Sequence, residues 1–379
     1  MQIYLDNNAT TPVSQKVISE LLPYLHTHFG NASSTHNKGL PAQKAIDKAR
    51  KRVANAIGAE PSEIVFTSGG SESNNLAIKG VFFTPQNFCK GHLIISSFEH
   101  AAVREPALYL EKVGVKITIV SCSPMGLIDP NDIRKAIRTD TKLISIMHAN
   151  NEIGTIQPIS EIAKISRKNN ILLHTDAAQS VGKTDVHVDR MGVDLLTIAG
   201  HKLYAPKGIG ALYIRKGIQL NPLIQGVGHE QGRRAGTENV AYQVALGAAM
   251  ELVQTEGPSY FSQMKQYRDL LFSLLKRGIG DELTQNGAMA PRLPNTLSVN
   301  FPNVSGAQLL QNCPAVCAST SAACHSRQTF RTNTQKAIGL SAKKAAGTVR
   351  FSLGWRTTEQ EIRQAAAHLL TSYRDLTNA

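Results

Sequence analysis

The chain has 379 residues, of which 42% are hydrophobic and 18% are charged, a balance typical of a globular protein. That length exceeds one ordinary hydrophobic core and predicts two domains that share an interface. An excess of 41 basic over 28 acidic residues gives a formal net charge of +13, which favours anionic ligands. Because the basic residues are spread out and their clusters are short, we expect no direct nucleic-acid ligand.

The sequence contains no apolar run of membrane-spanning length, so we expect no contact with a membrane. The first residues, Met1–Asp6, lack a basic start followed by an apolar run, so we expect no secretory signal. A sparse, odd set of cysteines argues against a disulfide framework and predicts a reducing, cytoplasmic location. The cysteines are Cys89, Cys122, Cys313, Cys317 and Cys324.

Two periodicities alternate through the middle of the chain. Apolar runs of strand length are Ile64–Phe66, Leu93–Ile95, Ile117–Val120, Leu143–Met147, Ile171–Leu173, Leu195–Ile198 and Ala211–Ile214. Helix-like stretches between most of them are Asn75–Phe83, Ala101–Lys112, Asn131–Arg138 and Ile159–Asn169. This alternation predicts an α/β fold with a mostly parallel central sheet covered by helices.

The character of the sequence changes after a long helical pattern from Glu238 to about Glu256, which Gly257-Pro258 interrupts. A helix-like stretch to Lys276, a strand at Thr296–Phe301 and a last helix from Glu359 to about Leu376 follow. These elements predict a smaller α+β domain. We expect residues 13–257 to form the large domain, and residues 1–12 with 258–379 to form the small one.

Three segments at predicted strand ends carry side chains suited to chemistry, since ligands bind at that edge of an open α/β sheet. The turn at Gly69–Ser71 joins a strand to a helix and suits an anion. Asp176 ends a buried strand, where it either caps a helix or pairs with a pyridinium nitrogen. Lys202 follows another strand, either as a solvated surface charge or as an amine that forms a Schiff base.

Together, in this order, these segments resemble fold-type I pyridoxal-phosphate enzymes. The sequence is similar to the class V aminotransferase superfamily and, within it, to the cysteine desulfurases and the related selenocysteine lyases. The matching stretches are Leu5–Pro12, Thr67–Gly80, Glu99–His100, Asn150–Gly154, Asp176–Gln179, Gly200–Lys202, Arg234–Asn239 and Arg350–Ser352. They cover nearly the whole chain in the family's order.

The resemblance implies roles for residues around the cofactor, pyridoxal 5'-phosphate. Lys202 would bind the cofactor covalently and later move the Cα proton of the substrate. Asp176 would keep the pyridine nitrogen protonated, and Gln179 would hydrogen-bond the ring oxygen. His100 would stack on the ring and act as an acid and base. No metal is implied.

The resemblance also implies how the two anionic groups are held. Gly70, Ser71 and His201 would bind the cofactor phosphate, and Thr237 would reach a phosphate across a homodimer interface. Asn151 would contact the cofactor and the substrate carboxylate, which Arg350 would bind as a bidentate fork. One departure is Ala199, since many desulfurases carry a serine there that donates to the phosphate.

Cys324 lies in Ala318–Ser326, where small residues lead into Ala-Cys as in the family's active-site segment. A packed free cysteine is the commonest fate of this residue type, but the resemblance makes Cys324 the sulfur-accepting nucleophile. The separation of Cys324 from Arg350 resembles the desulfurases with a long cysteine loop. Cys313 and Cys317 lack the Cys-x-x-Cys spacing of a metal site.

The resemblance therefore implies a cysteine desulfurase that converts L-cysteine to L-alanine. It would leave a persulfide on Cys324 for a sulfur-acceptor protein, whose pathway stays open between iron–sulfur assembly, tRNA thiolation and DNA modification. One alternative is a selenocysteine lyase that uses the same residues on selenocysteine. The other is a basic adaptor that binds sulfur-accepting proteins or tRNA without catalysis.

Overall fold

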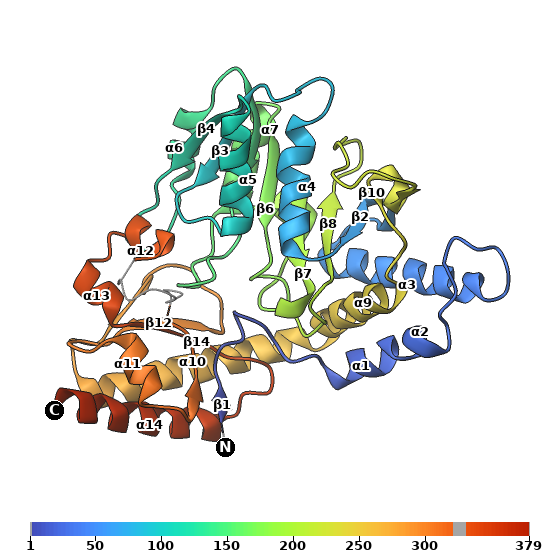
Figure 1. Cartoon of the computed structure of the whole chain (residues 1–379). Coiled ribbons are helices and arrows are strands. Elements are labelled where there is room, and N and C mark those ends of the chain that lie inside the picture. Colours follow the sequence, from blue (N-terminus) through green and yellow to red (C-terminus); the bar gives the residue numbers. More distant parts are fainter. Residues whose placement is uncertain (1, 321–330, 379) are drawn as a thin grey trace.

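The computed structural model describes residues 2–320 and 331–378. A seven-stranded sheet forms the centre of its larger part (Figure 1). In spatial order the strands are β2 (Ile64–Thr67), β8 (Gly210–Ile214), β7 (Leu195–Ala199), β6 (Leu172–Asp176), β5 (Thr141–Ser145), β3 (His92–Ser96) and β4 (Lys116–Val120). Each of the seven apolar runs in the sequence therefore forms a strand.

The predicted mostly parallel sheet is confirmed, with one reversed strand. β3, β4, β5, β6 and β7 pair in parallel, whereas β8 is antiparallel to both β2 and β7. Because the parallel strands share a direction, their carboxyl ends meet at one edge. Asp176, opposite Thr197 in the register, and Ala199 both lie at that edge.

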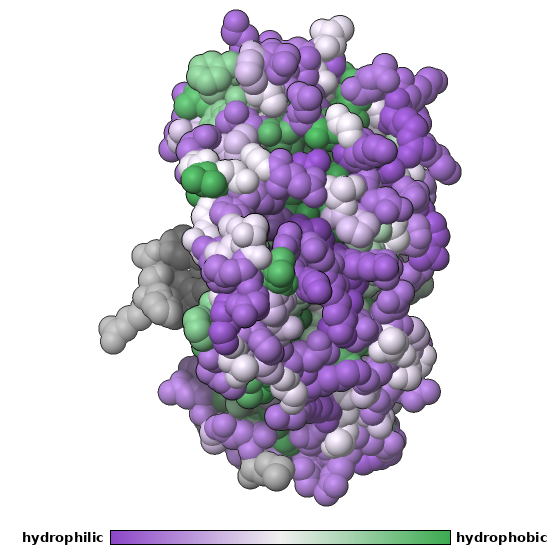
Figure 2. Space-filling view, turned by 90° about the vertical axis from the view of Figure 1, so that its right-hand side faces the viewer, coloured by the Kyte–Doolittle hydropathy of each residue, from purple (hydrophilic) through white to green (hydrophobic). Residues whose placement is uncertain are grey.

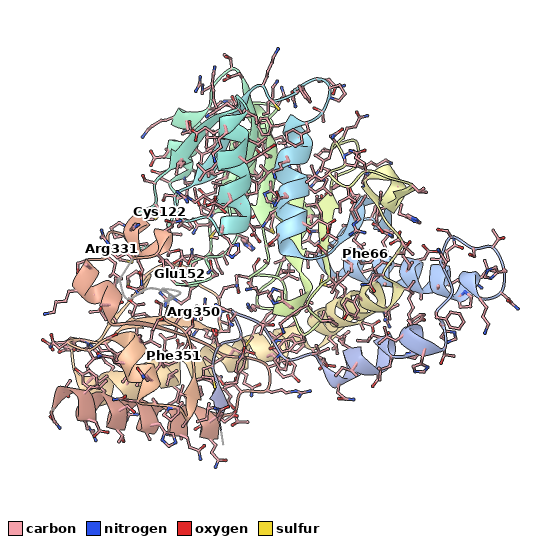
Figure 3. All side chains as sticks on the ribbon, in the orientation of Figure 1. Phe66, Cys122, Glu152, Arg331, Arg350 and Phe351 are labelled. Atoms are coloured by element: carbon pink, nitrogen blue, oxygen red, sulfur yellow. The ribbon has the colours of Figure 1, made fainter. Side chains whose placement is uncertain are left out.

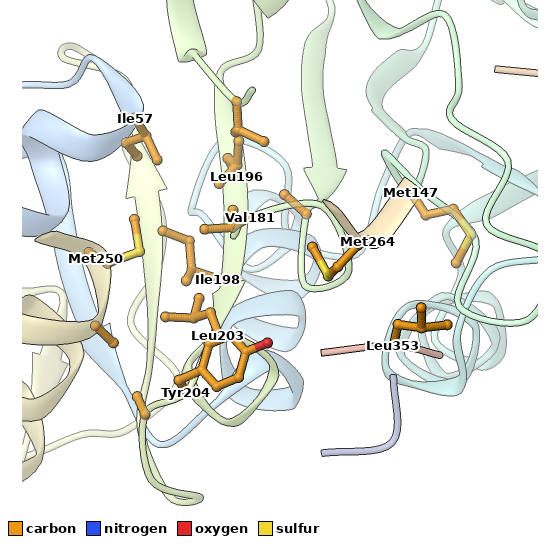
Figure 4. Packing of buried hydrophobic residues seen from close by; sticks show 14 of the residues in the cluster. Ile57, Met147, Val181, Leu196, Ile198, Leu203, Tyr204, Met250, Met264 and Leu353 are labelled. Carbon is orange, nitrogen blue, oxygen red and sulfur yellow. The ribbon is translucent and has the colours of Figure 1, made fainter. Parts of the chain in front are cut away.

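Helices cover both faces of this sheet. On one face α4 (Gly70–Phe82) and α5 (Ala101–Lys112) pack on side chains such as Leu93 and Leu143. The other face is covered by α3 (Gly39–Ile57), α7 (Ile159–Lys168) and α9 (Val240–Thr255). Figure 4 shows this second core, in which Leu196 and Ile198 lie near Met250. Strands buried on both faces read as continuous apolar runs for this reason.

The smaller part contains an antiparallel sheet in the order β11-β12-β14 and lies beside the seven-stranded sheet in Figure 1. Its strands are β11 (Thr284–Gln285), β12 (Thr296–Asn300) and β14 (Thr348–Ser352). Its helices are α10 (Gly257–Ile279), α11 (Gly306–Gln311), α12 (Asn333–Ala337), α13 (Ala342–Ala346) and α14 (Glu359–Thr377). We propose from this arrangement the domain boundaries expected at 12/13 and 257/258.

The start of the chain reaches into the smaller part. β1 (Ile3–Tyr4) pairs in parallel with β13 (Val316–Cys317), and Asp6 bridges to Ser352 of β14. The remaining elements are α1 (Gln15–Leu21), α2 (Pro23–His26), α6 (Pro130–Ala136), α8 (Val188–Met191), β9 (Gly228–His229), β10 (Arg234–Ala235) and the 3-10 turns Pro61–Glu63, Gly200–Lys202 and Glu230–Gly232. The N-terminal segment therefore connects the two parts.

The molecular face in Figure 2 is mostly hydrophilic, with hydrophobic side chains scattered among polar ones. In the described part of the chain, no helix is both long and apolar enough to cross a membrane.

Candidate active site

A pocket of about 240 Å³ opens at the carboxyl ends of β5, β6 and β7, beside the first residues of α4 and α5. Its lining is Gly70, Ser71, Asn74, His100, Ala102, Met147, Ala149, Asn151, Asp176, Ala178, Gln179, Ala199, His201 and Lys202. The structure thus brings together most of the residues that the sequence analysis selected, although they come from distant segments of the chain.

Lys202 ends the 3-10 turn that directly follows β7. Its Nζ donates a hydrogen bond of 2.6 Å to the backbone carbonyl oxygen of Asn8. Burial, followed by the positive charge of Arg350, lowers the pKa of Lys202 to about 8. A lysine amine with a pKa near neutrality is poised to act as a nucleophile or base.

Asp176, the last residue of β6, is buried and presents a fixed carboxylate to the pocket. Its Oδ2 accepts a hydrogen bond of 2.8 Å from Asn74 Nδ2 of α4. Its Oδ1 accepts one of 2.9 Å from the backbone N–H of Ala178. These two bonds hold the side chain in place at the pocket, where a carboxylate can pair with a protonated ring nitrogen.

The other end of the pocket suits an anion. The N-terminus of the 13-residue helix α4 opens there, after Gly69 with a φ of 147°. A Cβ atom added to Gly70 would lie 3.2 Å from Cβ of Ala199, so the turn approaches β7 closely. Ala199 contributes a methyl group there and no donor, in agreement with the departure noted in the sequence.

His201 adds a neutral imidazole to the lining of the pocket. Burial, followed by the charges of Lys202 and Lys207, lowers the pKa of His201 to about 4. Its Nδ1 lies 3.2 Å from Oγ1 of Thr10. Neutral at physiological pH, the ring still has one N–H to donate to an anion.

His100 is the N-cap residue of α5 and an exposed part of the pocket wall. Its Nδ1 accepts a hydrogen bond of 3.1 Å from the backbone N–H of Ala102. In the neutral ring the proton is therefore on Nε2. The preceding Glu99 is buried, and its Oε1 accepts from Ser96 Oγ and from the Met147 N–H. This bridge between the ends of β3 and β5 holds the backbone next to His100.

Arg350 of β14 does not line the pocket directly. Its Nη2 pairs with Oδ1 of Asp6 at 2.7 Å, and its Nη1 donates to the backbone carbonyl oxygen of Asn151 at 3.0 Å. Figure 3 shows Arg350 near Glu152 in that view. The guanidinium is therefore fixed next to Asn151, which does line the pocket.

Besides Arg350, the predicted site residue Thr237 does not line this pocket. Thr237 is exposed and lies just before α9, outside the pocket of its own chain. Its role across a dimer interface stays a prediction. Cys324 lies outside the described residues. Within residues 2–320 and 331–378, no group of three or more His, Cys, Asp or Glu side chains could hold a metal ion.

Hydrogen-bonding residues that sequence reasoning did not select also shape the site. Asn8 supplies the carbonyl oxygen that Lys202 contacts, Asn74 holds Asp176, and Asp6 holds Arg350. Asp6, Asn8 and Asn74 fall inside the stretches that resemble the family. Their position there is the feature of the sequence by which they could have been selected. Lys183, which hydrogen-bonds Gln179, lies outside those stretches.

Comparison with known families agrees with this geometry. The aminotransferase class-V family model matches residues 3–364, and the chain belongs to that family. Class V aminotransferases and cysteine desulfurases depend on pyridoxal phosphate. The resemblance predicted from sequence is thus confirmed.

Individual relatives point to one group within the class V family. The chain is 46% identical over 363 residues to the cysteine desulfurase IscS of Dictyoglomus turgidum, across 95% of this chain and 92% of the relative. A solved NifS-like protein superposes with a TM-score of 0.90 at 36% identity, covering 98% of this chain and 99% of the other. The solved structure of SspA in complex with cysteine matches with a TM-score of 0.83 at 38% identity, covering 93% and 99%.

Proposed function

We propose that the chain is a pyridoxal-phosphate-dependent cysteine desulfurase that converts L-cysteine to L-alanine and transfers the sulfur to Cys324. The observation that carries this proposal is the pocket itself. An amine whose pKa is lowered to about 8, Lys202, shares that pocket with the fixed carboxylate of Asp176. The relatives described above that are named cysteine desulfurases support the choice of reaction.

The donor set of the pocket fits pyridoxal phosphate. The N-terminus of α4 and the His201 ring suit its phosphate, Asp176 suits its pyridinium nitrogen, and Lys202 suits its aldehyde carbon. Gln179 and Asn151 line the same pocket and would contact the ring. The bound cofactor supplies an electron sink that makes the Cα–H of a bound amino acid acidic.

Different residues of this chain would then carry out the successive steps of the reaction. Arg350, with Asn151, binds the substrate carboxylate and fixes the Cα–H bond relative to Lys202. Lys202, as the neutral amine, takes the Cα proton and returns a proton later. The Cys324 thiolate attacks the substrate sulfur, so an S–S bond forms as the C–S bond breaks. The carbon skeleton takes up a proton and leaves as alanine, and the persulfide stays on Cys324.

His100 is the candidate for the remaining proton transfers. Its Nδ1 is occupied by the Ala102 N–H, so Nε2–H is the group that the neutral ring presents to a substrate in the pocket, as a donor. A thiolate is needed for attack on sulfur, and His100 would accept the substrate or Cys324 thiol proton only when its Nδ1 releases the Ala102 N–H.

The same proposal covers partners and location. We propose a homodimer in which the exposed Thr237 of one protomer completes the phosphate site of the other. A sulfur-acceptor protein is expected as the partner that takes the persulfide. We propose a cytoplasmic location, since Cys89, Cys122, Cys313 and Cys317 are free thiols.

Alanine formation tests the function directly. The purified protein, loaded with pyridoxal phosphate, is incubated with L-cysteine, and alanine and protein-bound persulfide are measured. We expect both products, with no alanine from Lys202→Ala. A parallel assay with selenocysteine distinguishes the lyase alternative, which predicts turnover of selenocysteine and none of cysteine. The adaptor alternative predicts no turnover of either amino acid, and this result would refute the proposed function.

A further inference from the structure

Lys183 is a buried amine that the proposed reaction does not use. It is 4% exposed and lies four residues after Gln179, in the loop that follows β6. Its Nζ donates to Oε1 of Gln179 at 2.7 Å and to Oδ1 of Asn8 at 3.1 Å. Both partners are neutral amide oxygens. Burial, with the nearby charges of Lys202 and Arg350, lowers the pKa of Lys183 well below its ordinary value.

These contacts fix which way the Gln179 amide faces. Its oxygen accepts from Lys183, and its Nε2 donates to the backbone carbonyl oxygen of Asn8 at 3.0 Å. A flipped amide would place its oxygen against that carbonyl oxygen, which can only accept. The arrangement needs two N–H groups on Lys183, and both the neutral and the protonated amine provide them.

The Asn8 amide is fixed in the same way. Its Oδ1 accepts from Lys183 and from Asn295 Nδ2. Its Nδ2 donates to Thr296 Oγ1 at 2.8 Å and to the backbone carbonyl oxygen of Asn151 at 3.2 Å. The backbone carbonyl oxygen of Asn8 therefore sits in a rigid frame when it accepts from Gln179 and Lys202.

One hydrogen of the Gln179 amide is left for the pocket. Gln179 lines the pocket, and its Nε2 carries two hydrogens, of which one goes to Asn8. Its oxygen is turned to Lys183 and away from any ligand. A ligand beside Gln179 therefore meets an N–H donor.

We propose that Lys183 is a positioning residue that holds the Gln179 amide as a hydrogen-bond donor toward the ring oxygen of bound pyridoxal phosphate. The inference rests on the proposed function, because it takes pyridoxal phosphate as the occupant of the pocket. A buried lysine with a purely structural role would affect the stability of the fold and leave the electronic state of the ring unchanged.

The test is a double-mutant cycle with a spectroscopic readout. Lys183→Met keeps the length of the side chain and removes its donors. The absorption band of bound pyridoxal phosphate and its dissociation constant are measured for Lys183→Met, Gln179→Ala, the double variant and the unmodified protein. Lys112→Met, which removes an exposed lysine of α5, is the matched control.

We expect Lys183→Met to shift the band and to weaken cofactor binding by about tenfold, the loss of one well-placed hydrogen bond. In the Gln179→Ala background the same substitution should leave both quantities unchanged, because the Gln179 amide is gone and Asn295 still holds Oδ1 of Asn8. Lys112→Met should match the unmodified protein. Equal shifts in both backgrounds, or a band that Lys183→Met does not move, would overturn the inference while leaving the proposed function intact.

Two further outcomes stay informative. If Lys183→Met does not fold, Gln179→Glu replaces it, since Lys183 can pair with the new carboxylate and the Asn8 carbonyl oxygen, which loses the Gln179 donor, still accepts from Lys202. That variant presents oxygen in place of N–H, so its band should shift, and an unchanged band would overturn the inference. An unmodified protein without any cofactor band would instead refute the proposed function itself.

Discussion

Asp6 and Arg350 lie at opposite ends of the sequence and form an ion pair with an Oδ1–Nη2 distance of 2.7 Å. The Arg350 side chain is 8% exposed and the Asp6 side chain 21%. Asp6 therefore neutralises a largely buried guanidinium and holds it beside Asn151. The proposed carboxylate-binding residue is in this way positioned by the N-terminal segment.

Arg350→Lys should weaken the binding of L-cysteine more than it slows turnover. The ammonium group keeps the charge but loses the planar fork that holds a carboxylate with two parallel bonds. We expect KM for L-cysteine to rise about tenfold to about a hundredfold, with an unchanged cofactor band because Arg350 lies outside the pocket lining. Steady-state kinetics measure the effect, and an unchanged KM would place the substrate carboxylate elsewhere.

Capture of pyridoxal phosphate by cofactor-free protein should become faster as the pH rises through about 8. The pKa of Lys202 is lowered to about 8, so its amine is mostly protonated below that pH and mostly neutral above it. Only the neutral amine attacks an aldehyde. The rate of growth of the cofactor band is measured between about pH 7 and about pH 9. A rate independent of pH over this interval would contradict the prediction, and Lys202→Ala should form no band.

Cys324→Ser should bind pyridoxal phosphate and fail to release alanine. Cofactor binding depends on Lys202, Asp176, Gln179 and the start of α4. Attack on the substrate sulfur, in contrast, needs a thiolate. Alanine formation is assayed alongside the cofactor spectrum, with Cys317→Ser as a control that should keep both. Normal alanine production by Cys324→Ser would remove the persulfide step.

Glu230→Gln should lower the free energy of unfolding by about 3 kcal/mol, because it leaves the Arg50 charge uncompensated in a buried position. The Glu230 side chain is 1% exposed and accepts from both terminal nitrogens of Arg50 at 2.7 Å. The control is Glu359→Gln, which breaks an exposed pair with Arg363 and should cost less than about 1 kcal/mol. Urea denaturation compares the variants, and equal midpoints would contradict the prediction.

Some helices could be predicted from sequence with their bounds, and others could not. α5 has the predicted bounds Ala101–Lys112. α4 begins at Gly70 and not at Asn75, because its first turn is polar and shows no apolar period. α3, Gly39–Ile57, was not predicted at all. Half of its buried residues are alanines, which do not stand out as an apolar run, and it packs on α9 through close backbone approach, as at Gly247 and Ala49.

Some residues of the candidate active site could likewise be predicted from sequence, and others could not. Asp176 at a strand end and Lys202 in the loop after the next strand could be selected because strand order places both at one edge of the sheet. The roles of Asn8 and Lys183 depend on hydrogen bonds between segments that are far apart in the sequence. No local sequence pattern encodes such bonds, so they can be identified only from the three-dimensional structure.

The hydrogen bonds from Asn7 and Asn8 to Ser352 bear on biosynthesis. A nascent chain can complete the seven-stranded sheet, with Lys202 at its edge, well before β14 leaves the ribosome. Until then Asn7 and Asn8 have no hydrogen-bond partner at Ser352. Contacts between residues so far apart in the sequence form late, because they close a very long loop. The complete site, which also needs Arg350 of β14, is thus expected to form only at the end of synthesis, and ribosome-bound chains halted before β14 should not turn over L-cysteine.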